Sequence, residues 1–191
     1  MRITGGKAVR RRLKVPKGLD LRPTPGLVKQ AVFNSLGSRV EGAHVLELFA
    51  GTGALSLEAL SRGAISAICV EKSSRHAAIL RENFQTAGFA PEVLQTRVQD
   101  VFTAIGQLEQ DGRHFELVVA DPPYGEKNLG RRSTSFAQQL LDDPRLPHLL
   151  SPGGILVLGH TKRDTLEVPA WWAEQKLLKH GDSFMRFLTG N

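Results

Sequence analysis

The sequence predicts an α/β fold built on a doubly wound sheet that is mostly parallel and ends in antiparallel strands. Short apolar runs alternate with helical segments along most of the chain, which is typical of strands joined by crossover helices. A glycine-rich turn follows the first apolar run, and a Gly-Asp turn links the last two. The 191 residues, 41% of them hydrophobic, suffice for one domain of ordinary size with a proper core.

Apolar runs are expected to form seven strands, at residues 43–49, 65–70, 92–98, 115–120, 155–159, 175–179 and 184–188. Pro152-Gly153-Gly154 is expected to turn the chain into the fifth strand. His180-Gly181-Asp182 predicts that the last two strands form a hairpin.

Helices are expected before and between these strands, at residues 25–36, 54–62, 73–87, 100–108 and 136–141. Thr24 is a natural N-cap for the first helix, and Pro25 fits its first position. Ser73 or Ser74 is expected to cap the third helix.

The positive charge of the chain is concentrated in residues 1–22, which we expect to form a basic arm before a main domain of residues 23–191. This arm carries +7, whereas the rest of the chain carries −1. Its apolar positions predict two short strands around the turn Gly5-Gly6, although a solvated, disordered tail would carry the same charge. A basic arm on a near-neutral body is typical of proteins that bind phosphate backbone. The residues that we expect to contact nucleic acid are Arg10, Arg11, Arg12, Lys14, Arg22, Lys127, Arg131 and Arg132.

Several global features exclude other classes. Cys69 is the only cysteine, which excludes a disulfide framework, and its apolar surroundings predict a buried small residue. No apolar stretch is long enough to span a membrane and no secretory signal begins the chain, so we expect a cytoplasmic monomer without a membrane partner. The six histidines lack metal-ligand spacing, so no metal is expected. Trp171 and Trp172 could be core or an exposed RNA platform, and we favour the core.

Polar or glycine-rich elements follow four of the predicted strands, at the sheet edge where doubly wound folds bind ligands. The first begins at Glu47 and lets the backbone approach a ligand at a helix N-terminus; it includes Phe49, Ala50, Gly51, Thr52, Gly53 and Ala54. The second is Glu71 with Lys72, where a carboxylate can accept both hydroxyls of a ribose. The third is Asp100 with Val101, within reach of an adenine amino group. Taken singly, these elements could be an ordinary turn, a surface charge and a helix cap.

The fourth element, Asp121-Pro122-Pro123-Tyr124, is the candidate reaction centre, and Asp121 is also expected to adjoin the cofactor. It combines a hydrogen-bond acceptor, a stiff backbone and a flat stacking surface at the end of a buried strand, which suits a planar base with an amino group. Asp121 is expected to accept one N–H of this amine and the Pro122 carbonyl the other, while Tyr124 stacks on the base. The alternative is a strand terminator followed by a turn.

In this order and at these strand ends, the elements resemble the S-adenosylmethionine-dependent class I methyltransferases that methylate exocyclic amines of bases. Longer matches resemble the RsmD family: Arg2-Ile3-Thr4-Gly5-Gly6, Arg22-Pro23-Thr24, Phe33-Asn34, Leu48 to Leu55, Leu57 to Ala64, Val70-Glu71 and Asp121 to Tyr124. The resemblance covers nearly the whole chain. It implies a Rossmann-like methyltransferase sheet of seven strands, S-adenosyl-L-methionine as cofactor, and methylation of the exocyclic N2 of one guanine in 16S ribosomal RNA, free or in the small subunit.

The sequence departs from the family pattern in three places. Pro25-Gly26-Leu27 replaces a threonine, an acid and an arginine, Glu47 replaces an aspartate, and the insert at residues 126–135 is longer and more basic than expected.

Three other functions remain open. A DNA adenine-N6 or cytosine-N4 methyltransferase could use the same tetrapeptide, but the chain lacks a large target-recognition domain. An NAD-dependent oxidoreductase would need a third glycine where Ser56 stands, and a non-catalytic RNA-binding module would leave Asp121 and Tyr124 unexplained.

Overall fold

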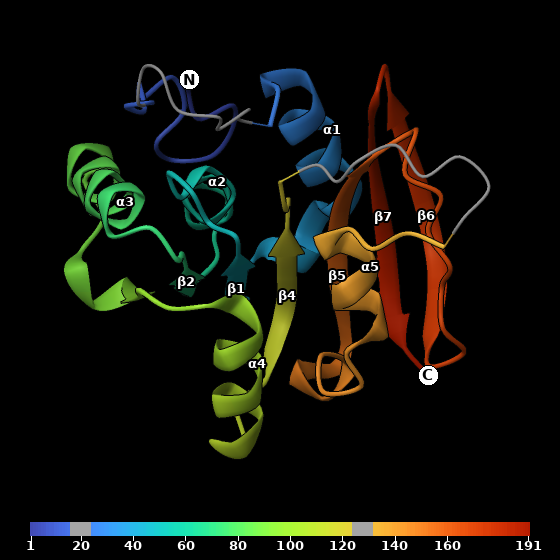
Figure 1. Ribbon diagram of the computed structural model, residues 1–191. Coiled ribbons are helices and arrows are strands. Elements are labelled where there is room, and N and C mark those ends of the chain that lie inside the picture. The colour runs from blue at the N-terminus through green and yellow to red at the C-terminus, as the bar shows by residue number, and fades with distance from the viewer. Residues whose placement is uncertain (16–23, 124–131) are drawn as a thin grey trace.

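The protein, seen in a computed structural model that describes residues 1–15, 24–123 and 132–191, contains a seven-stranded sheet with the order β3-β2-β1-β4-β5-β7-β6 (Figure 1). Its strands are β1 (His44–Leu48), β2 (Ser66–Val70), β3 (Leu94–Arg97), β4 (Phe115–Ala120), β5 (Leu150–Thr161), β6 (Trp172–His180) and β7 (Ser183–Gly190). Strands β1 to β5 pair in parallel, whereas β7 runs antiparallel to both β5 and β6. The predicted fold class is therefore confirmed.

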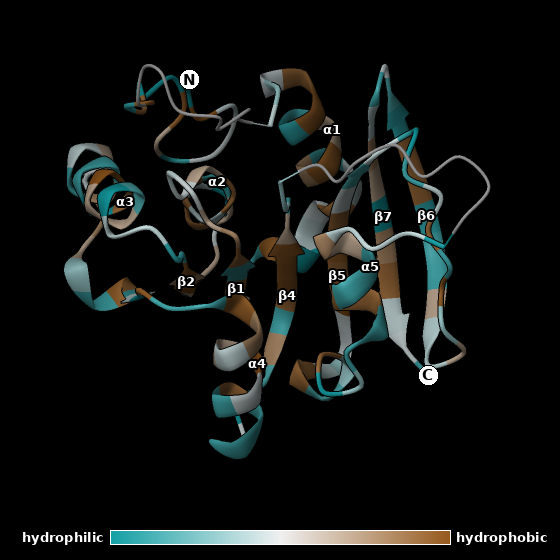
Figure 2. Cartoon of the chain, in the orientation of Figure 1, coloured by the Kyte–Doolittle hydropathy of each residue, from teal (hydrophilic) through white to brown (hydrophobic). Residues whose placement is uncertain are grey.

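Helices cover both faces of this sheet, as a doubly wound fold requires. They are α1 (Gly26–Leu36), α2 (Ala54–Ser61), α3 (Ser74–Ala87), α4 (Val101–Gln110) and α5 (Phe136–Asp142), with short 3-10 turns at Gly37–Val40, Pro91–Val93 and Pro147–Leu149. One apolar core joins α1, α2 and α3 to the sheet, and a second core joins α4 and α5 to the opposite face. The central strands are predominantly hydrophobic, and β6 at the edge is more hydrophilic (Figure 2). None of the described helices is long and apolar enough to cross a membrane.

The N-terminal segment, residues 1–15, does not form two regular strands, so the predicted hairpin is not confirmed. Its ends still run antiparallel, with a bridge between Arg2 and Arg12 and a backbone hydrogen bond from Ile3 N to the Arg11 carbonyl at 3.1 Å. The residues between them pack against the end of α2, where a Cβ added to Gly6 would lie 1.8 Å from the Ser61 carbonyl oxygen, so this glycine permits close approach. Ile3, Ala8 and Leu13 are buried in the first core, which explains why the chain follows the surface of α2.

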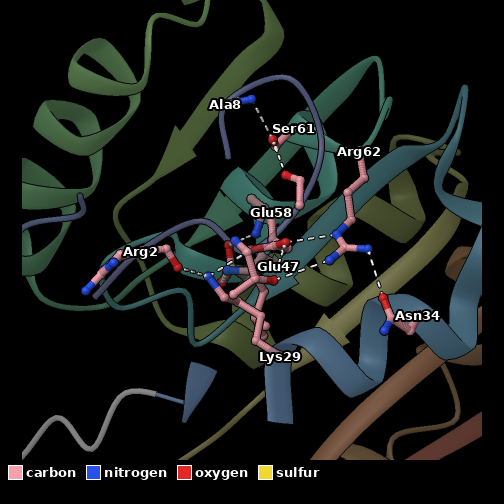
Figure 3. A network of polar contacts seen from close by, with 12 residues as sticks. Arg2, Ala8, Lys29, Asn34, Glu47, Glu58, Ser61 and Arg62 are labelled. Atoms are coloured by element: carbon pink, nitrogen blue, oxygen red, sulfur yellow. Dashed lines mark hydrogen bonds and ion pairs between the residues drawn. The ribbon is translucent and has the colours of Figure 1, made fainter. Parts of the chain in front are cut away.

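A buried polar network holds this segment in place (Figure 3). Glu58 on α2 accepts hydrogen bonds from the backbone and hydroxyl of Thr4, at 2.8 and 2.7 Å, and from Arg62 at 2.8 Å. Lys29 on α1 lies 2.9 Å from the same carboxylate and donates to the Arg2 carbonyl at 2.6 Å. The side chains of Lys29 and Glu58 are fully buried, so α1, α2 and the N-terminal segment meet at one ion pair.

Four local predictions have clear outcomes. Ser73 caps α3 through the His76 N–H, as expected. Thr24 does not cap α1, because the cap position is Pro25 and the Thr24 hydroxyl donates elsewhere. The turn predicted at residues 152–154 is instead part of β5, where the strand shifts register against β4. Trp172 is in the core as predicted, whereas Trp171 is 41% exposed, so the prediction for it was wrong.

Candidate active site

The carboxyl ends of β1, β2 and β4 meet at one edge of the sheet. Leu48 pairs with both Val70 and Ala120, so the residues that follow these three strands are neighbours. An open pocket of about 470 Å³ lies at this edge. It brings together seven residues predicted from the sequence: Glu47, Phe49, Ala50, Gly51, Thr52, Ala54 and Asp121. Five predicted residues do not line this pocket: Gly53 directly before α2, Glu71 and Lys72 after β2, Asp100 after β3, and Val101 at the start of α4.

The loop between β1 and α2 needs an unusual backbone. Phe49, Gly51 and Gly53 have positive φ angles of 56°, 54° and 75°. A Cβ on Gly53 would lie 2.9 Å from Leu80 Cγ, so the third of these positions also requires a glycine for packing. The tight turn starts α2 directly at Ala54, so the first turn of this helix lies at the pocket.

Glu47 places a carboxylate against the partly positive N-terminus of α2. Alternation along β1 directs this side chain to the α2 face, and its oxygens accept from the N–H groups of Leu55 at 3.2 Å and Ser56 at 3.0 Å. Burial raises the pKa of Glu47 to about 6, although these hydrogen bonds oppose the rise. The pocket therefore contains a buried carboxylate already bound to the amides that would otherwise attract an anion.

Glu71, directly after β2, stabilises the glycine loop, residues 49–53 between β1 and α2. Its Oε2 accepts from Gly51 N and its Oε1 from Ser73 N, both at 2.8 Å. His76 Nδ1 lies 3.4 Å from Oε1. The carboxylate thus joins the glycine loop to the start of α3, and ribose binding by Glu71 stays a prediction.

Asp100 is the N-cap of α4, which was the structural alternative for this residue. Its Oδ1 accepts from Phe102 N at 3.0 Å, while Oδ2 lies 3.6 Å from Lys72 Nζ. The Lys72 side chain is 79% exposed, and Val101 is buried against the sheet. Adenine recognition by these residues stays a prediction.

Asp121 ends β4 beside the pocket. The Thr24 hydroxyl donates to its Oδ2, and Gly159 of β5 lies against its Oδ1. Burial raises the pKa of Asp121, and the hydrogen bond from Thr24 opposes the rise. Pro122 is buried and Pro123 is exposed, whereas Tyr124 lies outside the described residues.

The predicted nucleic-acid contacts differ in their surroundings. Arg10, Arg11 and Arg12 are exposed and make no ion pair with the described residues. Lys14 is paired with Glu82 at 2.8 Å, and Arg132 contacts two acids, at 2.8 and 3.1 Å. The other three predicted contacts, Arg22, Lys127 and Arg131, lie outside the described part of the chain.

Sequence reasoning missed the contribution of the N-terminal segment to the pocket. Met1 and Val15 of this segment line it, as does Thr24 before α1, together with the predicted residues. Buried Asn83 of α3 also joins the N-terminal segment to the glycine loop. Its side chain accepts from Lys14 N, donates to the Lys14 carbonyl, and donates to the Thr52 carbonyl at 3.0 Å. An asparagine on the buried face of a predicted helix was a signal for such a bridge.

The sheet order, the glycine loop at the first strand and the Asp-Pro-Pro element at the fourth define a class I methyltransferase. A family model described as "Conserved hypothetical protein 95" matches residues 1–189, and the chain belongs to this family, the RsmD family.

Known proteins agree with this assignment. The chain is 30% identical over 172 residues to "Ribosomal RNA small subunit methyltransferase D" of Haemophilus influenzae, covering 90% of this chain and 84% of the relative. A hypothetical protein of Thermus thermophilus superposes with a TM-score of 0.78 at 28% identity, covering 100% of this chain and 99% of that one. An RNA methyltransferase from Salinibacter ruber, solved with S-adenosyl-L-homocysteine, has a TM-score of 0.63 at 22% identity; 88% of this chain and 94% of that chain align, and the likeness concerns the fold.

Proposed function

We propose that this protein transfers a methyl group from S-adenosyl-L-methionine to the exocyclic N2 of one guanine in 16S ribosomal RNA. The observation that carries the proposal is Asp121 at the end of β4, beside a pocket built from the glycine loop. Membership of the RsmD family makes the chain a methyltransferase, and a relative named as a small-subunit ribosomal RNA methyltransferase supports the RNA substrate.

The pocket suits a cationic cofactor better than a dinucleotide. A pyrophosphate binds at a helix N-terminus through free amides, but Glu47 already accepts from the Leu55 and Ser56 amides and adds a negative charge. This arrangement disfavours the NAD alternative. When bound, S-adenosyl-L-methionine supplies an electrophilic methyl group on a positive sulfonium. Glu47 and the glycine loop would hold its methionine end, while Glu71 and Asp100 would face its ribose and adenine.

Asp121 would act on the target amine as an acceptor, since the amine is far too weak an acid for a carboxylate to deprotonate in advance. The lone pair of this nitrogen is delocalised into the guanine ring. An N–H bond to Asp121, with a second to the Pro122 carbonyl, would favour rehybridisation and stabilise the positive charge that develops on nitrogen. The nitrogen would then bond to the methyl carbon while the carbon–sulfur bond breaks, and the methylated amine would afterwards release its proton to water. Tyr124 would stack on the base and fix the angle of attack.

The proposal is tested by mapping methylation in 16S ribosomal RNA from cells with and without this protein. Loss of one N2-methylguanine on deletion, restored by the wild-type gene, is the expected result. Purified protein should add the same group in vitro to RNA or small subunits from the deletion strain. Methylation of adenine or cytosine in duplex DNA would instead favour the alternative DNA methyltransferase.

Exposed arginines of the N-terminal segment would supply the affinity for RNA. Arg10, Arg11 and Arg12 are free of ion pairs with the described residues and belong to a segment that also lines the cofactor pocket. Phosphate contacts here would orient the RNA over the site without reading its bases. Lys14 and Arg132 would first have to exchange their acidic partners for phosphate.

Replacing Arg10, Arg11 and Arg12 together by glutamine should weaken RNA binding and flatten its salt dependence. Each lost phosphate contact reduces the slope of log K against log[salt] by about 0.7 to 0.9. Filter binding between about 50 and 200 mM salt measures the slope, and calorimetry should find unchanged cofactor affinity. Arg113→Gln, an exposed change just before β4, is the matched control. An unchanged slope in the triple variant would contradict this role.

A further inference from the structure

The Thr24 hydroxyl bonds a residue after β4 and does not cap the neighbouring helix α1. Thr24 stands directly before α1, yet the N-cap of this helix has no side-chain hydrogen bond. Its side chain instead reaches Asp121, 97 positions along the chain, and donates to Oδ2. Thr24 is only 9% exposed, and both residues line the same pocket.

The other oxygen of Asp121 lies against the backbone of β5. A Cβ added to Gly159 would be 2.3 Å from Asp121 Oδ1, so the absence of a side chain at this position makes room for the carboxylate. Among the described residues, Thr24 is the only hydrogen-bond donor to Asp121. The carboxylate is therefore confined by Gly159 on one side and oriented by a single donor on the other.

We propose that Thr24 is a positioning residue for methyl transfer, holding Asp121 Oδ2 so that the remaining acceptor capacity of the carboxylate is directed at the target amine. The proposal deepens the proposed function and rests on it. The terminal torsion of an aspartate is broad, and a donor to one oxygen selects one orientation of the pair. A hydroxyl bond to a carboxylate also favours its ionised form, so it lowers the pKa that burial raises at Asp121.

Thr24→Val removes the hydroxyl at nearly constant shape, and Thr24→Ser keeps it. We expect the valine variant to lose about 10- to 100-fold in kcat, the loss of one hydrogen bond to a charged group, with little change in KM for RNA or in cofactor affinity. Its rate should also fall off at a higher pH on the acidic side, because Asp121 is then harder to ionise. The serine variant should retain most of the wild-type rate and its pH profile.

Thr189→Val is a matched control, because this residue lies near the end of β7, where it pairs with Ala173 of β6, and it does not line the pocket. Equal losses in the valine and serine variants, or a valine variant with the wild-type rate and pH profile, would overturn the proposal. A loss of kcat matched by a fall in melting temperature and in cofactor affinity would also overturn it, since that pattern indicates a structural role.

A measurement without RNA separates this inference from the substrate assignment. Carbon-13 NMR of labelled aspartate follows the titration of Asp121, which should move to higher pH in Thr24→Val and stay near wild type in Thr24→Ser. If the Asp121 titration shifts in Thr24→Val but the wild-type protein fails to methylate ribosomal RNA, the effect of Thr24 on Asp121 is supported and the proposed substrate is wrong. No shift would overturn the positioning role whatever the substrate.

Discussion

Replacing Asp121 by asparagine is expected to lower the rate of methyl transfer by about 10² to 10³, the usual loss when one group that stabilises a developing charge is removed. The amide keeps the size of the side chain at the end of β4 but lacks the negative charge that would stabilise a positive amine nitrogen. Asp121→Ala should lose at least as much. Transfer of a labelled methyl group to 16S ribosomal RNA under single-turnover conditions measures the effect.

Measuring cofactor binding separates two possible roles of Asp121, accepting a hydrogen bond from the target amine and binding the cofactor. Calorimetry should find the affinity for S-adenosyl-L-methionine little changed in both variants. The glycine loop and the start of α2 are held by hydrogen bonds to Glu71 and Glu47, and these bonds do not involve Asp121. Asp111→Asn makes the same chemical change on an exposed residue after α4 and should have the wild-type rate. A fully active Asp121→Asn enzyme would exclude the proposed mechanism.

The fold could be predicted from the sequence because its information is local. Buried parallel strands such as β4 are short apolar runs, and the glycine loop and the caps of α3 and α4 depend on neighbours within a few positions. The carboxyl edge then follows from topology alone. This is why Glu47, Gly51 and Asp121 were expected to share a pocket, and they do.

The rest of the site depends on contacts between distant segments. Thr24 has the residue type and position of a helix cap, and nothing nearby in the sequence indicates that its hydroxyl reaches Asp121. Gly5-Gly6 has the composition of a hairpin turn, but these glycines allow the backbone to approach the end of α2. In both cases a tertiary contact overrides the local preference.

Lys29 shows a signal that the sequence did contain. It lies four residues before Phe33, so it occupies the same buried face of α1, and Glu58 stands in an otherwise apolar stretch of α2. Two opposite charges on the buried faces of two predicted helices indicate an ion pair, because neither could be buried alone. This pairing would have placed α1 against α2.

Lys29→Met should therefore destabilise the protein by about 3–5 kcal/mol, because it leaves the Glu58 carboxylate buried without its main cation. Burial alone would raise the pKa of Glu58, but the hydrogen bonds and charge of Lys29, with help from Thr4, hold it below the usual value. A carboxyl group with a lowered pKa contributes stability that is present at neutral pH and is lost as the pH falls through the folded-state value. Urea denaturation at neutral pH and at a pH below the ordinary glutamate pKa should accordingly show a smaller effect of Lys29→Met at the lower pH.

The double variant Lys29→Met/Glu58→Gln tests whether the loss comes from an unpaired charge. A neutral amide can still accept a hydrogen bond from Thr4 without needing a cation, so the double variant should be less destabilised than the sum of the two single changes. Lys14→Met, which breaks an exposed pair with Glu82, should cost only about 0–1 kcal/mol. If Lys29→Met cost no more than this control, the buried pair would not be what fastens the N-terminal segment to α2. Since that segment carries the exposed arginines and lines the pocket proposed for the cofactor, its detachment should weaken RNA and cofactor binding together, unlike the arginine triple variant.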